Sequence, residues 1–172
     1  MIHSEHPFKP GPDDRDPARR FRGRLAAAVT VVTSGSEWER TGLTISSLLV
    51  IEGEPALVHL VVGPTTDLWG TAAETGRFIV HVCRHDDNRL ADVFAGLAPA
   101  PGGMFTNVAT EQTEWGPAFI DLPDRAYCTF QSADEAGWSG LMVGRIDRVD
   151  ISDLTDPMIY FRSAYRRLSP GR

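Results

Sequence analysis

The sequence predicts a mainly β protein, a small and largely antiparallel β-barrel with short helices at its rim. About seven segments carry the β-branched and aromatic residues typical of strands, and the helical patterns between them are few and short. Strands and helices do not alternate as βαβ units do, which disfavours a parallel, doubly wound sheet. With 172 residues, 42% of them hydrophobic, the chain has the size of one domain and can bury a sizeable core.

The N-terminal part divides into a tail and a first helix. Residues 1–17 are rich in proline and acidic groups, so we expect a mobile tail, with the folded domain spanning residues 18–172. Asp16 suits the N-cap and Pro17 the first position of a short helix. Apolar residues recur on one face, which predicts that this helix packs on the body as a lid: Phe21, Leu25 and Val29.

The remaining elements follow from apolar patterns and from glycine and proline breaks. A turn segment, SGSEWER, separates the first two strands as a hairpin, and the apolar run before Gly63 has the pattern of an interior strand. Gly63-Pro64 ends that strand, and Gly76 ends the helix after it. We expect helices over 67–75 and 86–97, and strands at Ala28–Thr33, Thr41–Val50, Ala56–Val62, Arg77–Cys83, Tyr127–Ala133, Leu141–Ile151 and Met158–Phe161.

Composition excludes some classes of partner. A net charge of -6 gives no electrostatic reason to expect nucleic acid or an anionic membrane. No window approaches the roughly 18 apolar residues of a membrane span, and no signal-peptide pattern is present. Cys83 and Cys128 lie far apart in apolar runs, so we expect buried, reduced thiols in a cytoplasmic protein.

Two hydroxyl clusters are the candidate binding residues. The segment GLTISSLLV, Gly42 to Val50, places Thr44, Ser46 and Ser47 in an otherwise apolar strand, and Thr65-Thr66 stands where a strand ends and a helix starts. Hydroxyls and the free amides of a helix start can hold a phosphate without lysine. The alternative is that Thr66 only caps its helix and that the serines satisfy a strand edge.

Asp67 opposes simple phosphate capture, because an acidic group in the first helical turn already neutralises the helix dipole. A compensating arginine is then needed. The candidates are Arg84, Arg89, Arg166 and Arg167, and the sequence does not choose among them.

Other chemistries have weaker support. No G-x-S-x-G elbow is present, so hydrolase chemistry is not indicated. His81 and His85 are closely spaced, but a pair of histidines does not make a metal site, and we expect none. His59, within its apolar run, has the pattern of a satisfied core histidine.

Seven segments follow one another in an informative order. They are AAAVTVVT, GLTISSLLV with EGEP, TGRFIVHV, LADVFAGL, EWGPAFIDL, YCTF and DPMIYFRSAYRRL. Over about residues 20–168 this series resembles the flavin reductase-like family, whose fold is an FMN-binding split β-barrel, antiparallel and Greek-key, that works as a homodimer.

The resemblance implies an oxidoreductase that binds FMN, or alternatively FAD, and reduces it with NADH or NADPH. A monooxygenase that uses the reduced flavin is the implied partner. The residues that match the family's flavin loop and phosphate loop are Gly42, Leu43, Thr44, Ile45, Ser46 and Ser47, and Gly63, Pro64, Thr65, Thr66 and Asp67.

The chain departs from the family pattern near the nicotinamide. Many members carry Gly-Asp-His before the penultimate long strand, whereas this chain reads Gly137-Trp138-Ser139-Gly140, so Trp138 and Ser139 become the nicotinamide-side candidates. Trp138 either stacks on a ring, fills the nicotinamide space, or is an ordinary core or interface aromatic. No catalytic residue is assigned.

Two further positions differ from the family. Asp67-Leu68 replaces a basic residue and threonine, and His81 replaces an asparagine. Three hypotheses therefore stand: a flavin reductase, a split-barrel protein that keeps its cofactor but has lost nicotinamide-dependent catalysis, and a dimeric scaffold without cofactor.

Overall fold

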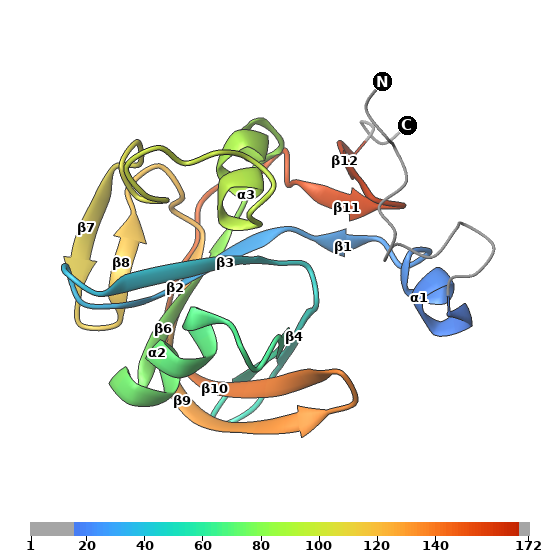
Figure 1. Cartoon of the computed structure of the whole chain (residues 1–172). Coiled ribbons are helices and arrows are strands. Elements are labelled where there is room, and N and C mark those ends of the chain that lie inside the picture. The colour runs from blue at the N-terminus through green and yellow to red at the C-terminus, as the bar shows by residue number, and fades with distance from the viewer. Residues whose placement is uncertain (1–15, 169–172) are drawn as a thin grey trace.

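A computed structural model describes residues 16–168, which form a curled antiparallel sheet with short helices (Figure 1). Most of the predicted tail, residues 1–15, and residues 169–172 lie outside the described residues. The helices are α1 (Pro17–Arg22), α2 (Asp67–Thr75), a 3₁₀ turn (His85–Asp87) and α3 (Asn88–Phe94). The strands are β1 (Ala27–Ala28), β2 (Thr30–Gly35), β3 (Arg40–Ile45), β4 (Leu48–Ile51), β5 (Leu57–Val62), β6 (Arg77–Val82), β7 (Thr110–Thr113), β8 (Gly116–Phe119), β9 (Arg125–Ala136), β10 (Ser139–Asp150), β11 (Ile159–Phe161) and β12 (Ala164–Arg166).

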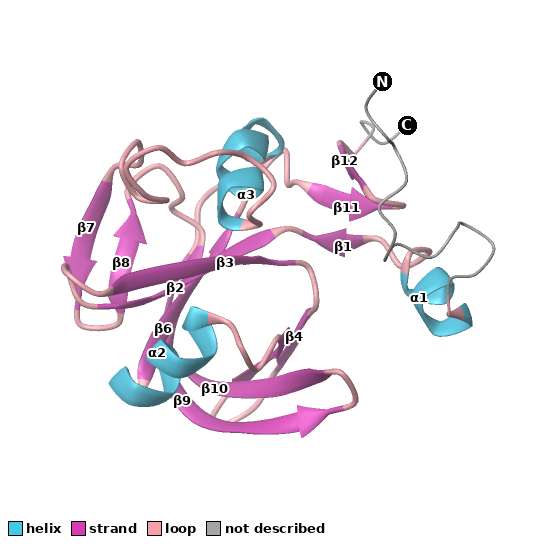
Figure 2. Cartoon of the chain, in the orientation of Figure 1, coloured by secondary structure: helices cyan, strands magenta, loops and turns pink. Residues whose placement is uncertain are grey.

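The main sheet has seven strands in the order β3-β2-β6-β9-β10-β5-β4. Every pairing is antiparallel, which confirms the predicted mainly β, antiparallel architecture (Figure 2). The single strand predicted over Thr41–Val50 is wrong, because the chain leaves β3 at one edge of the sheet and enters β4 at the other. Ser46 and Ser47 make this crossing, and the sheet must curl for two residues to span it.

Helix α2 packs across the hollow of the curled sheet (Figure 1). It begins at Asp67 and ends at Gly76, whose φ of 72° is the left-handed conformation that glycine adopts at helix ends. Leu68 and Ala72 of α2 are fully buried in one apolar cluster with the inward-facing residues of the sheet. This cluster is the core that fixes the curvature of the barrel.

A second apolar cluster lies under α3. Phe94 of α3 packs edge-on against Phe105 and Phe119, with ring centroids 5.0 and 5.3 Å away. Phe119 belongs to the hairpin of β7 and β8, which sequence patterns did not predict because both strands are only four residues long and β7 is polar. In place of one helix over 86–97, the chain forms the 3₁₀ turn followed by α3, which ends at Phe94, and Leu97 beyond it is exposed.

The first helix does not behave as a lid. α1 forms as predicted, with the Asp16 carboxylate accepting from the amide of Ala18, but the helix has no buried residue. Phe21 and Leu25 are 65% and 57% exposed. Only Val29 of that predicted face is buried, and it lies beyond the helix. The helix stands beside the barrel, joined through β1 to the small sheet of β11 and β12 (Figure 1).

Candidate functional site

Three segments that the sequence singled out meet at one end of the β4-β5-β10 part of the sheet. The amide of Val61 donates to the carbonyl of Ser47 over 2.9 Å, so the start of β4 lies beside the end of β5. Val62, the last residue of β5, is opposite Gly140 near the start of β10. The hydroxyl crossing of residues 46–47, the loop of residues 63–67 and the turn of residues 137–139 therefore share this end.

A groove of about 1070 Å³ opens at the same end of the sheet. Ser46, Ser47 and Ser139 line it, which brings two of the predicted segments into one surface. Its apolar wall comes from the sheet: Leu48, Leu49, Val61 and Leu141. Its other wall comes from α1, the residues after it and the β11–β12 hairpin, including Tyr160.

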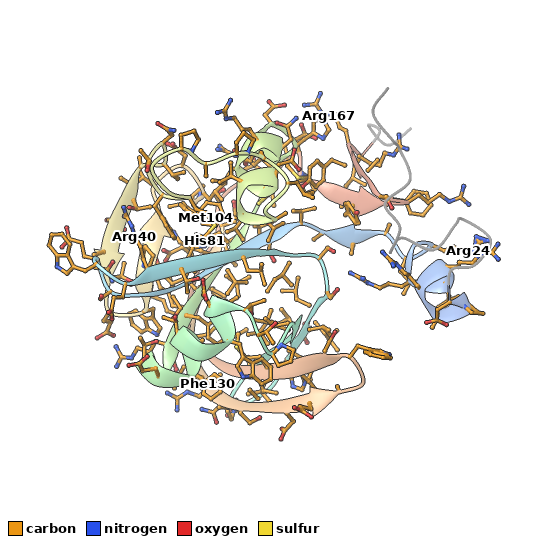
Figure 3. All side chains as sticks on the ribbon, in the orientation of Figure 1. Arg24, Arg40, His81, Met104, Phe130 and Arg167 are labelled. Carbon is orange, nitrogen blue, oxygen red and sulfur yellow. The ribbon has the colours of Figure 1, made fainter. Side chains whose placement is uncertain are left out.

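Arginine dominates the charge of the groove. Its lining contains Arg19, Arg20, Arg22, Arg24 and Arg162, and no aspartate or glutamate. The guanidinium of Arg22 donates to the hydroxyl of Ser47 over 3.2 Å, which joins α1 to the serine crossing. Figure 3 labels Arg24 on this side of the molecule, next to α1. The groove can therefore attract an anion although the chain as a whole is acidic.

His59 does not have the satisfied environment that the sequence predicted. It lines the groove from β5, and its Nε2 atom is buried without a hydrogen-bond partner among the described residues. A buried polar atom normally finds a partner, because leaving it unpaired costs about 1–3 kcal/mol. A ligand in the groove would supply one.

The other residues of the predicted flavin loop have structural roles. The Thr44 hydroxyl donates to the carbonyl of Ala91 in α3 over 2.6 Å, and Ile45 belongs to the buried core. Leu43 packs against the same core. A side chain at Gly42 would meet the Phe94 ring at 2.7 Å, so this glycine allows α3 to pack on β3. Of Gly42 to Ser47, only Ser46 and Ser47 line the groove.

The predicted phosphate loop lies at this end of the sheet but not in the groove lining. Pro64, Thr65 and Asp67 are exposed. Thr66 is the N-cap residue of α2, yet its hydroxyl donates back to the carbonyl of Gly63 over 2.8 Å and makes no cap bond. Hydroxyl capping of α2 by Thr66 is therefore not observed.

Trp138 projects from the turn between β9 and β10 and is fully exposed. It is therefore not a core aromatic and does not fill any space within its own chain. Ser139, the next residue, lines the groove. Nearby, a side chain at Gly140 would meet the Trp69 ring at 2.1 Å, so the glycine lets α2 pack on β10.

None of the four arginines proposed from the sequence lines the groove. Arg84 pairs with Asp87, and Arg167 pairs with Asp86 and Asp156. Arg89 lines a separate cavity of about 210 Å³ between α3 and the loop after it, and Arg166 is exposed on β12. The arginines of the groove carried a signal that the sequence reasoning missed, since four of them fall within residues 19–24, a stretch that contains no acidic residue.

The remaining titratable residues of interest are structural. His81 is fully buried, and burial lowers its pKa to about 3. Its Nδ1 lies 3.0 Å from the carbonyl of Val31, and its Nε2 accepts from the amide of Phe119 over 3.2 Å. Burial raises the pKa of Cys83 and Cys128 to about 12, and both are free thiols. These three side chains belong to the core and not to the groove.

Residues 16–168 contain neither a metal-binding cluster nor a membrane-spanning helix. No group of histidine, cysteine and carboxylate side chains in that range could hold a metal ion. None of the helices in the same range has the length and apolarity needed to cross a membrane.

The chain is similar to reductases of known activity. It is 28% identical over 145 residues to the reductase component of 4-hydroxyphenylacetate 3-monooxygenase of Thermus thermophilus, covering 84% of this chain and 91% of the relative. It is 26% identical over 167 residues to the FMN reductase (NADH) SmoA of Agrobacterium fabrum, covering 96% and 93%. The fold matches the NADH:FAD oxidoreductase SgcE6 of Streptomyces globisporus with a TM-score of 0.82 and 24% identity, covering 95% of this chain and 98% of that one.

The family model "Flavin reductase like domain" matches residues 22–169, which is most of the chain. The match includes both serines of the groove, the sheet that forms its apolar wall and the β11–β12 hairpin. The curled sheet, with its order and crossing, agrees with the split barrel that the resemblance implied. The chain belongs to the flavin reductase-like family.

Proposed function

We propose that the groove is the flavin and nicotinamide site of an NAD(P)H-dependent flavin reductase. The observation that carries this proposal is the convergence of Ser46, Ser47 and Ser139 on one arginine-lined groove in a chain of the flavin reductase-like family. The protein is an oxidoreductase that uses flavin, FMN or alternatively FAD, with NADH or NADPH as electron donor. A flavin held in the groove would supply the hydride-accepting chemistry, and the groove residues would position it against the nicotinamide.

The residues of the groove fit a flavin. Leu48, Val61 and Leu141 offer an apolar face for a planar ring, and Tyr160 offers an aromatic one. The hydroxyls of Ser46 and Ser47 can donate to or accept from polar edges of the ring. The unpartnered Nε2 of His59 provides another polar contact at the wall of the groove. The predicted loop of Gly63 to Asp67 lies at the same end and remains the proposed phosphate loop.

A second copy of the chain is expected to cover the open side of the site. Leu49, Val50 and Ile51 of the edge strand β4 are 61, 54 and 40% exposed, and Val61 beside them is 46% exposed. Apolar side chains gathered on an edge strand favour burial against another chain. Trp138, exposed near the same end, would then contact the second copy. A homodimer therefore belongs to this proposal.

The relatives suggest the wider role. Several are named reductase components of monooxygenases, including the Thermus thermophilus protein and that of a resorcinol hydroxylase from Rhizobium. We propose that reduced flavin leaving this protein serves a monooxygenase of the same two-component type. The buried, unbridged cysteines favour a cytoplasmic location.

One experiment tests the proposal and its main alternative. The purified protein is mixed with FMN and then with NADH or NADPH without oxygen, and the visible flavin absorbance is followed. Bleaching above the uncatalysed rate is expected. Flavin uptake without bleaching by either nucleotide would instead support the cofactor-binding alternative, which the turn Gly137-Trp138-Ser139-Gly140 favours because it contains no histidine.

The serines provide a residue-level test. Ser46→Ala with Ser47→Ala should weaken flavin binding about thirtyfold, since two hydrogen bonds are lost and each contributes roughly 1 kcal/mol. Ser36→Ala is the matched control, because Ser36 lies in the exposed turn between β2 and β3 and bonds only the amide of Glu39. Equal flavin affinity in the double variant and the control would remove the serines from the site.

A further inference from the structure

The charge of the groove exceeds what one flavin phosphate requires. Five arginines line it without a carboxylate among the lining residues. None of the five forms an ion pair within residues 16–168, whereas many arginines elsewhere in the chain do: Arg77, Arg84, Arg125, Arg145, Arg148 and Arg167. We call the five groove arginines the arginine rim.

Helix α1 carries this charge at a cost to its own stability. Arg19 and Arg22 are three residues apart within the helix, and Arg24 follows just beyond its C-cap, Gly23. Like charges three residues apart on a helix repel by a few tenths of a kcal/mol per pair. The helix is six residues long and buries no side chain, so packing does not offset the repulsion. An anion bound to these guanidiniums would offset the repulsion.

The register of β1 and β11 brings the rest of the rim to α1. Ala27 is opposite Tyr160 in this antiparallel pair, so the residues before Ala27 run beside the residues after Tyr160. Arg162 is therefore held next to the end of α1. The turn that holds it is unusual, because Arg162 and Ser163 have φ values of 48° and 62°.

This turn is one that glycine and asparagine normally form. A side chain other than glycine in the left-handed region costs of order 1 kcal/mol, and such strain is concentrated at functional sites. Here the two strained residues, Arg162 and Ser163, both line the groove. The turn thus places a guanidinium and a hydroxyl on the rim.

We infer that the arginine rim binds the diphosphate of a dinucleotide. A guanidinium binds phosphate oxygens through two parallel N–H donors, so several guanidiniums in one wall match two linked phosphates better than one. The groove, at about 1070 Å³, is at the upper end of the usual size of ligand pockets and has room for more than a mononucleotide. This inference rests on the proposed function. The diphosphate that the rim binds belongs either to FAD or to NADH or NADPH.

The test compares ligands that carry no phosphate, one phosphate or a diphosphate. Riboflavin, FMN, FAD, ADP and NADH are titrated into the native protein and into the variant Arg22→Gln/Arg24→Gln, with dissociation constants from calorimetry. Arg40→Gln is the control, since Arg40 forms no ion pair among the described residues and lies at the opposite end of the molecule from Arg24 (Figure 3). Because α1 buries no side chain, the variant should fold, which circular dichroism checks.

The rim predicts a specific pattern. ADP and at least one dinucleotide should bind the double variant about tenfold or more weakly than the native protein, whereas riboflavin should bind both equally. Among the dinucleotides, a loss confined to FAD or to NADH identifies which of the two uses the rim. The inference would be overturned if ADP and the dinucleotides bound the variant and the native protein with equal affinity. If the native protein binds ADP but no flavin, the proposed function fails while the loss of ADP in the variant still supports the rim.

Discussion

Replacing His81 with glutamine tests how burial of an imidazole controls stability at acidic pH. His81 is fully buried and its pKa is lowered to about 3, chiefly because burial disfavours the charged ring. Its ring nitrogens bond the carbonyl of Val31 and the amide of Phe119. Glutamine offers a donor and an acceptor but does not titrate in this range.

The sign and size of this change in stability follow from the linkage between proton binding and folding. In the unfolded chain this histidine titrates near its ordinary pKa of 6.5, whereas in the folded chain it stays neutral down to a pKa of about 3. The stability that the neutral ring permits is complete above pH 6.5 and is lost as the pH falls from 6.5 toward 3. Between pH 7 and pH 5 the unfolded state gains protonation worth about 1.9 kcal/mol, so the native protein loses that much from this residue.

Urea unfolding at pH 7 and pH 5 measures the effect. Other groups titrate in both proteins, so their contributions cancel when the loss in the glutamine variant is subtracted from the loss in the native protein. That difference should be about 2 kcal/mol. If His81→Gln does not fold, His81→Asn gives the same comparison. The same acid-induced loss in native and variant protein would refute the reasoning about the buried imidazole.

Two other predictions concern the core. Gly144→Ala should destabilise the fold by about 1–3 kcal/mol, because the added Cβ would lie 2.3 Å from the buried Phe78 ring. The control is Gly70→Ala, at a helix position with open space around it, which should stabilise the fold by roughly 0.5–1 kcal/mol. Equal urea midpoints for the two variants would contradict the packing account. Cys83 and Cys128, with pKa raised to about 12, should not react with Ellman's reagent at pH 8 until guanidinium unfolds the protein, and rapid labelling of the native protein would show that one of them is accessible.

Local patterns in the sequence determined the class of fold and most element positions. The strand predicted at Ala56–Val62 corresponds to β5, and the helix over 67–75 corresponds to α2, because apolar periodicity and glycine or proline breaks act over a few residues. The ordered segments also identified the family, which the family model confirmed over residues 22–169. Short polar strands such as β7 escaped prediction because they carry no such pattern.

The tertiary structure decided which residues share a surface. Ser46 and Ser47 looked like two positions within one strand, but they cross between the two edges of a curled sheet, because β3 pairs with β2 and β4 with β5. Thr44, two residues away, faces α3 instead. Pairing of distant strands sets these directions, and no local pattern encodes it.

The positive charge of the groove likewise depends partly on the sequence and partly on the tertiary structure. The sequence alone established an acidic chain with a run of arginines at residues 19–24 and a further arginine at position 162 that no local pattern distinguishes. Only the pairing of Ala27 with Tyr160 brings Arg162 beside that run and turns scattered charges into one wall of a groove. Composition and local patterns fix what each segment can form, whereas strand register, which depends on contacts between residues far apart in the chain, fixes which side chains act together.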